Sequence, residues 1–373
     1  MTKLFQYNKS EINKVDSCIV HIYELLLDGS NYINTLDIST DTIINTSCIS
    51  NLNDYTFLPV HIKEYILTNT NQSITYKTTI NGKNIRLSFC TMKRYKSNVS
   101  VQQIRAVFLI IYLLSLHASK QCSQQLYINI FLTPFKKELP SNKNETIGAT
   151  HVNSGLSNSG CNHTSRLIIY RDEEWFKVLI HELFHNFHLD FSTRDITKSA
   201  RELREYCGIQ SDYAIYETYC ETWARILNCC IHSFITSTSL IKKHTTGLRM
   251  KKDYINNFNK LIELERQFSL KQADLILKQF QRKEDYKEDS NVFCYYILTA
   301  CLMNDYLSFL TWCHVNNPTF IKFKDTSKNL DAFTKLIINK LDMDFNDGII
   351  YVRILNRGDN NKSLRMSKGD IPF

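Results

Sequence analysis

The sequence predicts an α+β protein with a mixed strand-and-helix N-terminal half and a mostly helical C-terminal half. Two observations carry this prediction. Strands rich in β-branched residues alternate with apolar helices up to about residue 190, and apolar residues then recur at helical spacing from about residue 195 to 342. The chain has 373 residues, 43% of them hydrophobic, with only 10 Gly and 5 Pro. This composition is typical of a packed globular protein of two lobes or one large unit, and it excludes the fibrous and disordered classes.

The first 95 residues are expected to form a mixed α/β region that contains a short helix and a β-hairpin. Pro59 precedes a helical stretch from Val60 to Leu67. Two stretches rich in β-branched residues, 73–80 and 83–89, flank Asn81-Gly82, the dipeptide most favoured in two-residue hairpin turns.

Residues 96–190 are expected to form a second unit that ends in a helix. In chain order, the predicted elements are a buried helix at Val101–Ala118, a strand at Leu126–Leu132, an extended piece at Gly148–Gly155, a strand at Arg166–Tyr170 and a helix at Glu173–Phe187. The last helix begins at Asp172-Glu173-Glu174, whose negative charges suit a helix N-terminus. Residues 191–357 form the helical half, and residues 358–373 are expected to be a loosely ordered tail.

The sequence offers no segment suited to a membrane. The most apolar run, residues 106–114, is too short, since a bilayer requires ~20 apolar residues. The residues that follow Met1 do not resemble a secretory signal. The 12 cysteines include no C-x-x-C pair, and several lie in apolar helical patterns, so we expect reduced, buried thiols and an intracellular location.

The formal net charge of +8 leaves association with nucleic acid open but does not indicate it. The densest basic stretch runs from Lys242 to Lys252 and is short and helix-like, which is more typical of a solvated helix face than of a phosphate-binding patch. No pattern specifies an oligomeric state.

One pattern carries chemistry: His181-Glu182-Leu183-Phe184-His185 within the predicted helix 173–187. Histidines at positions i and i+4 lie one turn apart on one helix face, so both imidazoles can bind a single Zn²⁺ at ~2.0–2.1 Å. Glu182 is then placed to act as the general base. His188 is seven residues beyond His181 and ~10 Å further along the axis, too far to share the ion, so we interpret it as a supporting or core residue.

The third zinc ligand is expected on a later helix, at Glu217. Glu217 and Glu221 share one face of a helix whose other side is apolar. One carboxylate can bind the ion while the next orients a ligand histidine through its free ring N–H. For Glu221 an equally good interpretation is an exposed ion pair with Arg225 at i+4.

His181-Glu182-Leu183-Phe184-His185 followed by Glu217-Thr-Tyr-Cys-Glu221 resembles the gluzincin zinc metallopeptidases over roughly residues 100–235. The glutamate helix is similar to that of the anthrax lethal factor protease domain, and more weakly the chain resembles metallopeptidases attributed to large DNA viruses. The resemblance implies a zincin-like fold with a small twisted mixed sheet, a backing helix and an active-site helix. It also implies His181, His185 and Glu217 as metal ligands, Glu182 as base and Glu221 as the supporting carboxylate.

The same resemblance implies an edge strand beside the active-site helix. We expect this strand at residues 150–154, where His151, Val152 and Asn153 would bind an extended peptide by strand addition. Tyr213, one turn before Glu217, is our first choice as the donor that stabilises the oxyanion, with Tyr170, Tyr216 and His151 as alternatives.

The sequence therefore predicts a zinc-dependent metallopeptidase with a protein or peptide substrate. The alternative is a non-enzymatic structural or virion-associated protein on an inherited zincin scaffold. A cleft beside His181 that is open to a peptide favours the enzyme, and a cleft plugged by the chain itself favours the alternative.

Overall fold

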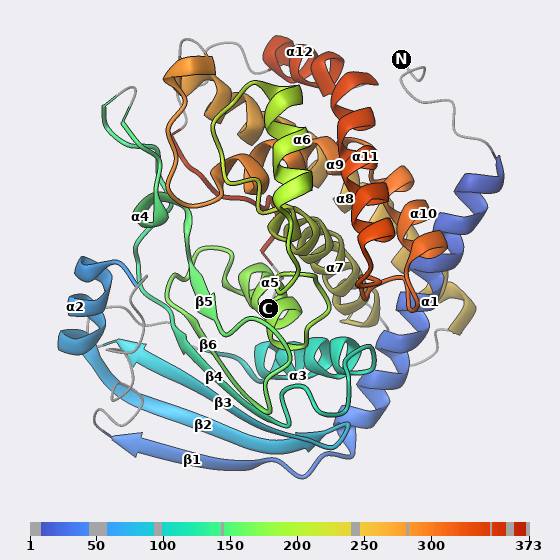
Figure 1. Ribbon diagram of the computed structural model, residues 1–373. Helices are drawn as coiled ribbons and strands as arrows, with labels where there is room; N and C mark the ends of the chain where they lie inside the picture. Colours follow the sequence, from blue (N-terminus) through green and yellow to red (C-terminus); the bar gives the residue numbers. More distant parts are fainter. Residues whose placement is uncertain are drawn as a thin grey trace.

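The computed structural model describes residues 9–44, 58–92, 99–142, 145–239, 247–280, 283–343, 345–355 and 362–370. It is a mixed α+β structure in which a six-stranded sheet lies beneath a large helical half (Figure 1). The expected α+β class and helical C-terminal half are confirmed.

The sheet is mixed, with strand order β1-β2-β3-β4-β6-β5. Its strands are β1 Ser39–Ile44, β2 Thr70–Ile80, β3 Lys83–Met92, β4 Gln125–Phe131, β5 Gly155–Ser157 and β6 Thr164–Ile169. The central pairs β3–β4 and β4–β6 are parallel, whereas β1–β2, β2–β3 and β5–β6 are antiparallel. The short strand β5 is therefore an antiparallel edge on an otherwise parallel part of the sheet.

The predicted hairpin is present as β2 and β3. Asn81 and Gly82 form the two-residue turn with φ of 51° and 74°. Both angles lie in the left-handed region that this kind of turn requires, which explains the Asn-Gly pair. The predicted helix after Pro59 is also present as α2, Val60–Asn69.

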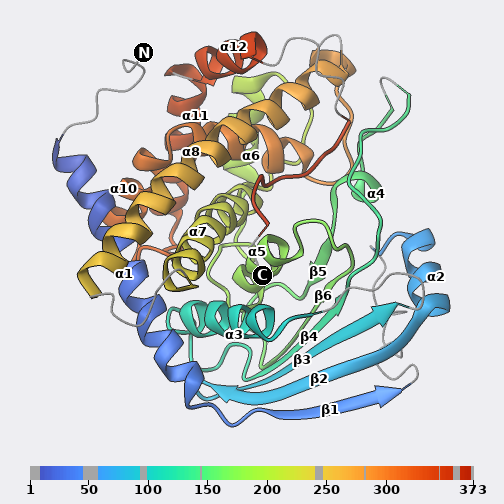
Figure 2. The same ribbon diagram turned by 180° about the vertical axis from the view of Figure 1, so that it is seen from behind.

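Helices α3 (Val101–Ser115) and α5 (Trp175–Asn186) pack against each other, and both belong to the main core together with one face of the sheet (Figures 1 and 2). The start of α3 is fixed by a capping box: Ser100 Oγ accepts a hydrogen bond from the Gln103 N–H, and the Gln103 side chain accepts one from the Ser100 N–H. Because α3 is enclosed by α1, α5 and the sheet, it is apolar on almost every side, as its sequence predicts.

A smaller apolar cluster, which includes Leu58, Ile62 and Ile66 of the α2 region, packs against Phe131, Ile168 and Tyr170. Neighbouring residues such as Ile130, Leu167 and Ile169 belong to the main core. Since successive side chains of a strand point to opposite faces, the parallel strands are buried on both sides.

The extended piece predicted at Gly148–Gly155 is wrong for most of its length. Residues Ala149–Val152 form a single helical turn, α4, and the edge strand begins only at Gly155. His151 stabilises this turn, because its Nδ1 accepts a hydrogen bond from the Gly148 N–H at 3.1 Å. The edge strand predicted at 150–154 is therefore displaced to Gly155–Ser157.

The helical half packs around α7. Its helices are α6 Thr197–Cys207, α7 Ile215–Ser239, α8 Gly247–Gln279, α9 Thr299–Asn304, α10 Tyr306–Asn316, α11 Ser327–Met343 and α12 Phe345–Leu355, with a π-helical segment at Phe293–Leu298 before α9. The N-terminal helix α1, Lys9–Asn34, contacts α3, α7, α8 and α10, so it joins the two halves (Figure 1). One continuous apolar core extends through both halves.

The expected loosely ordered tail is wrong for residues 362–370. This segment lies between α8 and the start of α5, and Leu364, Met366 and Ser367 are buried (Figure 2). Backbone N–H groups of Met366 and Ser367 donate to Glu174, and Tyr296 Oη donates to the Leu364 carbonyl. Side chains distant in the sequence supply these partners, so local composition gives no sign of them.

The described segments contain no single helix long and apolar enough to cross a membrane. One pair, Phe293–Asn304 with Tyr306–Asn316, meets the length and composition test together but is bent by 91°. Of the basic stretch 242–252, residues 242–246 lie outside the described part of the chain, and the remainder opens α8.

The expectation that all cysteines are reduced is wrong for one pair. Cys122, in the connection after α3, forms a disulfide with Cys161 in the loop between β5 and β6. The other described cysteines are free and buried, as expected, and Cys48 lies outside the described residues. The disulfide ties the loop that follows the edge strand to the body of the protein.

We predict that removing this disulfide destabilises the protein. Because the two cysteines are 39 positions apart in the sequence, the loss of the cross-link should lower the free energy of unfolding by about 2–4 kcal/mol in Cys161→Ser. Denaturant titration with and without reductant measures this. Reductant should destabilise the wild type and leave Cys161→Ser unchanged, and equal effects on both proteins would contradict the disulfide's role.

Candidate metal centre

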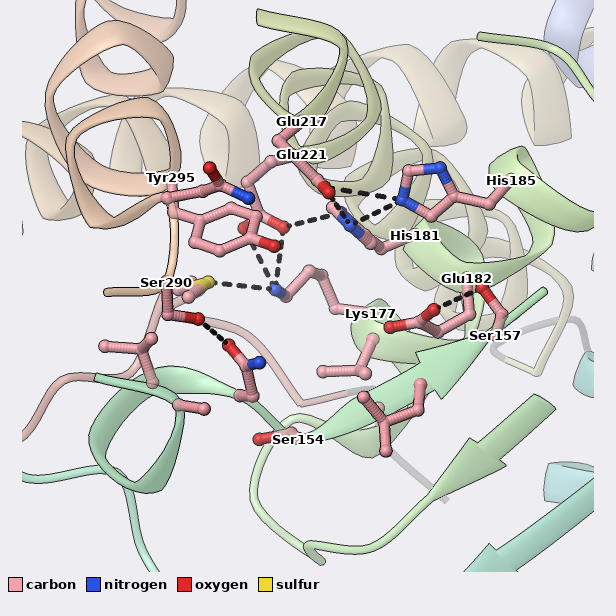
Figure 3. Close-up of a pocket in the computed structure, with 18 of the residues that line it drawn as sticks. Ser154, Ser157, Lys177, His181, Glu182, His185, Glu217, Glu221, Ser290 and Tyr295 are labelled. Atoms are coloured by element: carbon pink, nitrogen blue, oxygen red, sulfur yellow. Dashed lines mark hydrogen bonds and ion pairs between the residues drawn. The ribbon is translucent and has the colours of Figure 1, made fainter. Parts of the chain in front are cut away.

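Helix α5 brings His181, Glu182 and His185 to the centre of the molecule. Apart from Lys177 and the terminal Asn186, its other residues are apolar, and every one of its residues is buried. The helix packs on α7 and on strands β5 and β6. The i and i+4 spacing, together with this packing, places both imidazoles on the side of α5 that faces α7 (Figure 3).

Glu217, in the first turn of α7, meets both histidines (Figure 3). Its Oε2 lies 3.0 Å from His181 Nε2 and 3.3 Å from His185 Nε2, and the two Nε2 atoms are 3.2 Å apart. The residues predicted as the three metal ligands are therefore brought together.

These distances fit a metal ion. Donors at ~2.0–2.1 Å around a tetrahedral ion lie ~3.3 Å from one another, which is close to the three separations observed. Two ring nitrogens and a carboxylate oxygen all present lone pairs when deprotonated, and their convergence in a buried place calls for a cation.

Each histidine also has a further carboxylate beside its other ring nitrogen, Nδ1. His185 Nδ1 lies 2.5 Å from Asp190 Oδ2, and His181 Nδ1 lies 3.2 Å from Glu221 Oε2 without hydrogen-bond alignment. Carboxylates in these positions favour the proton on Nδ1, which leaves Nε2 free to bind a metal.

The two histidines and the carboxylates around them stabilise each other's charged forms. Burial favours a low pKa for His181 and His185, but the facing carboxylates outweigh it and raise the pKa of both. Burial favours a high pKa for Glu217, but the two histidines outweigh it and lower that pKa. Protons therefore compete with a metal for the imidazoles.

Cys220 also lies close to this group. Its Sγ is 3.6 Å from Asp190 Oδ2 and 3.9 Å from His185 Nδ1, which makes His185, Asp190 and Cys220 a second geometrically possible set of ligands. Burial raises the pKa of Cys220 well above its usual value, so the sulfur stays a thiol, which is a poor ligand. We therefore favour the set His181, His185 and Glu217.

Glu221 combines both interpretations that its sequence context allows. It contacts His181, and it also forms an ion pair with Arg225 at 2.9 Å, but this pair is fully buried and not on a wet surface. Lys177 Nζ completes the arrangement at 2.9 and 3.0 Å from the two oxygens of Glu221. Burial favours a high pKa for Glu221, but Lys177 and Arg225 outweigh it and hold the pKa well below its usual value.

This charge network reaches the C-terminal segment. Glu174 forms ion pairs with Lys137 and Lys177 and accepts hydrogen bonds from the Met366 and Ser367 N–H groups. On α8, Glu265 accepts from the Ser367 hydroxyl and the Lys368 N–H, and burial raises its pKa to about 7.

Glu182 lies on the same helix but faces strand β5. Its Oε2 accepts a hydrogen bond from the Ser157 hydroxyl at 2.6 Å (Figure 3). Together with the three candidate ligands it lines a cavity of about 410 Å³, which is also bordered by β5, by α4 and by residues 289–291. The position predicted for the base is thus in the cavity and beside the edge strand.

The structure does not place Tyr213 at the site. Its side chain is fully buried away from the cavity, and its hydroxyl donates to the Ile209 carbonyl at 2.9 Å. The reason is that Tyr213 precedes α7 in a left-handed conformation with φ of 50°, so the assumed helical turn towards Glu217 does not exist. Of the alternatives, Tyr216 lines the cavity, whereas Tyr170 and His151 do not.

Tyr295, for which the sequence predicts no role, lies beside His181. Its ring centroid is 5.8 Å from that of His181, and it lines the cavity on the side opposite β5 (Figure 3). Burial raises its pKa well above the usual value, and the carboxylates of Glu217, Glu182 and Glu221 add to this effect. The phenol therefore stays protonated and able to donate.

His188 does not lie on the helix face assumed for it. Helix α5 ends at Asn186, and His188 is left-handed with φ of 50°. Its ring approaches Asp190, 3.9 Å from Oδ1, and among the described interactions its only contact with a candidate ligand histidine is the backbone hydrogen bond that its N–H donates to the His185 carbonyl. Of the predicted substrate-binding residues, Val152 and Asn153 line the cavity, and Asn153 accepts a hydrogen bond from Ser290.

Four residues of the site were missed by sequence reasoning: Ser157, Lys177, Asp190 and Tyr295. Lys177 carried a signal, because it lies one turn before His181 on the same helix face. Asp190 follows the helix closely, but only the turn at 187–189 directs it back to His185. Tyr295 is distant in the sequence and gave no signal.

Comparisons with models of protein families, with curated proteins and with solved structures found no match to this chain. The geometry of the site is therefore the basis on which a function is proposed below.

We predict that Asp190→Asn weakens binding of a divalent ion about 10–100-fold, because Asp190 orients His185. Titration with Zn²⁺ against a competing chelator measures the affinity. In the wild type the affinity should also fall as pH is lowered from 8 to 6, since the raised histidine pKa values favour protons over metal. Asp331→Asn, at a surface pair with Lys198, is the control and should bind as the wild type does.

We predict that Glu265 makes the protein less stable as pH rises. Its folded pKa of about 7 exceeds the ordinary carboxyl value, so the folded state holds the proton more tightly. Stability is therefore fully present below about pH 4 and is lost up to about pH 7, by a few kcal/mol at most. Glu265→Gln should flatten this part of the pH profile in denaturant titrations, and an unchanged slope would contradict the assignment.

Proposed function

We propose that this protein is a zinc-dependent metallopeptidase with a zincin-like arrangement of the gluzincin type. The observation that carries the proposal is the convergence of His181, His185 and Glu217 at 3.0–3.3 Å beside Glu182, in a cavity bordered by an edge strand. Two imidazoles and one carboxylate in tetrahedral spacing form a donor set typical of catalytic zinc, which keeps its fourth position open.

A bound zinc ion would supply Lewis acidity to a water molecule and to the scissile carbonyl. The Glu182 carboxylate takes the proton from the attacking water and delivers it to the leaving amine. Tyr295 Oη, protonated and on the opposite side of the cavity, donates to the oxygen on which negative charge develops. Asp190 and Glu221 keep the ligand histidines in the tautomer that binds metal.

The substrate is proposed to be an extended peptide that adds to β5. This strand is the last in the sheet, so the edge that faces away from β6 is available for backbone hydrogen bonds. Leu156 and Ser157 both line the cavity, which places an added strand alongside Glu182.

The cavity favours the enzyme over the non-enzymatic alternative. A volume of about 410 Å³ beside His181, with the candidate base and ligands in its lining, supports hydrolysis over a scaffold whose cleft is filled by its own chain. The +8 charge plays no part in this mechanism.

We predict that the purified protein binds one zinc ion and cleaves peptides, and that Glu182→Gln abolishes cleavage while zinc remains bound. Loss of the base should reduce kcat/KM by at least ~10²–10⁴-fold. Metal analysis and a fluorogenic peptide library measure both properties. The control Glu205→Gln makes the same chemical change on an exposed face of α6 and should be neutral.

Two results would contradict the proposal. Full activity in Glu182→Gln would refute the assigned base. A wild type that binds zinc but cleaves no member of the library would favour the non-enzymatic alternative.

A further inference from the structure

We propose that strand β5 positions the general base, with Ser157 as the residue that holds it. This inference rests on the proposed peptidase function and assigns the edge strand a second task beside peptide binding. Ser157 acts through Glu182 and is therefore a positioning residue.

Strand β5 meets the Glu182 side chain at two positions, Ser157 and Gly155. The Ser157 hydroxyl donates to Oε2 at 2.6 Å. Two residues earlier, on the same face of the strand, Gly155 leaves the space that the side chain needs. A Cβ at position 155 would lie 2.7 Å from Glu182 Oε1 and 2.9 Å from its Cγ. Strand and carboxylate thus fit against each other closely.

The strand that makes this contact is itself fixed relative to α5. The residues of β5 pair with Ile169, Ile168 and Leu167 of β6. Just before β5, the Ser154 carbonyl accepts a hydrogen bond from the Tyr170 N–H. Just after it, the Asn158 carbonyl accepts one from Asn186 Nδ2, at the end of α5, at 2.7 Å. The hydroxyl of Ser157 is therefore presented from a rigid frame.

Such a frame is needed because of the chemistry of a glutamate base. The last torsion of a glutamate side chain has a broad, weakly restrained preference, so a free carboxylate samples many orientations. A hydrogen bond to one oxygen restrains this rotation and leaves the other oxygen for proton transfer. Ser157 contacts none of the three candidate metal ligands in the described hydrogen bonds, so its loss should alter the base and not the metal.

The test compares zinc-loaded wild type with Ser157→Ala, Ser157→Thr and the control Ser199→Ala. The Ser199 hydroxyl accepts a buried hydrogen bond from the Thr334 hydroxyl on α11, and Ser199 does not line the cavity. We expect Ser157→Ala to lower kcat ~10–100-fold, with KM and zinc affinity within ~2-fold of wild type. Ser157→Thr keeps the hydroxyl and should restore kcat to within ~3-fold, and Ser199→Ala should leave kcat unchanged.

A kcat of Ser157→Ala equal to that of the wild type would overturn the proposal. So would a Ser157→Thr variant as slow as Ser157→Ala, since retention of the hydroxyl would then not matter. Crystal structures of the zinc-loaded wild type and Ser157→Ala provide a readout that does not need activity. A displaced Glu182 carboxylate in the variant supports positioning by Ser157, and an unmoved one refutes it, even if the wild type cleaves no peptide.

Discussion

The packing of α5 against α7 is the interaction on which the rest of this structure depends. It brings Glu217 to two histidines that lie more than thirty residues earlier in the chain, and it buries all three side chains. Helix α7 can occupy this position because its remaining faces are enclosed by α1, α8, α9 and the π-helical segment. The helical half therefore holds the helix that carries Glu217 in place, which gives a physical reason for its length.

A network of buried ion pairs surrounds the site. Glu221, Lys177, Arg225, Glu174 and Lys137 are all almost fully buried, and each forms at least one ion pair. An unpaired charge at this depth is strongly unfavourable. Removal of one member of an ion pair would therefore destabilise the fold, because its partner would remain buried without a counter-charge. The network links His181 to the C-terminal segment through Glu221, Lys177 and Glu174.

Local patterns were sufficient for the elements whose signals lie within a few residues. Asn81-Gly82 specified a hairpin, Pro59 the start of α2, and the spacing of His181 and His185 a shared helix face. They failed where long-range contacts decide. The turn at Ala149–Val152, whose Thr150 carbonyl accepts a hydrogen bond from Arg171, and the buried segment 362–370, which contacts Glu174 and Tyr296, depend on partners far away in the chain.

By itself, the sequence determined the helix that carries His181, Glu182 and His185 and the pair of glutamates one turn apart, because helical periodicity fixes which side chains share a face. Only the tertiary structure decided that Glu217 faces both histidines, that Asp190 and Glu221 lie beside their other ring nitrogens, and that Tyr295 lies beside His181 while Tyr213 does not line the cavity. It also decided that the edge strand is Gly155–Ser157. The physical reason is that these relations arise from the packing of separate elements, and no local spacing encodes which surfaces of two helices or strands will meet.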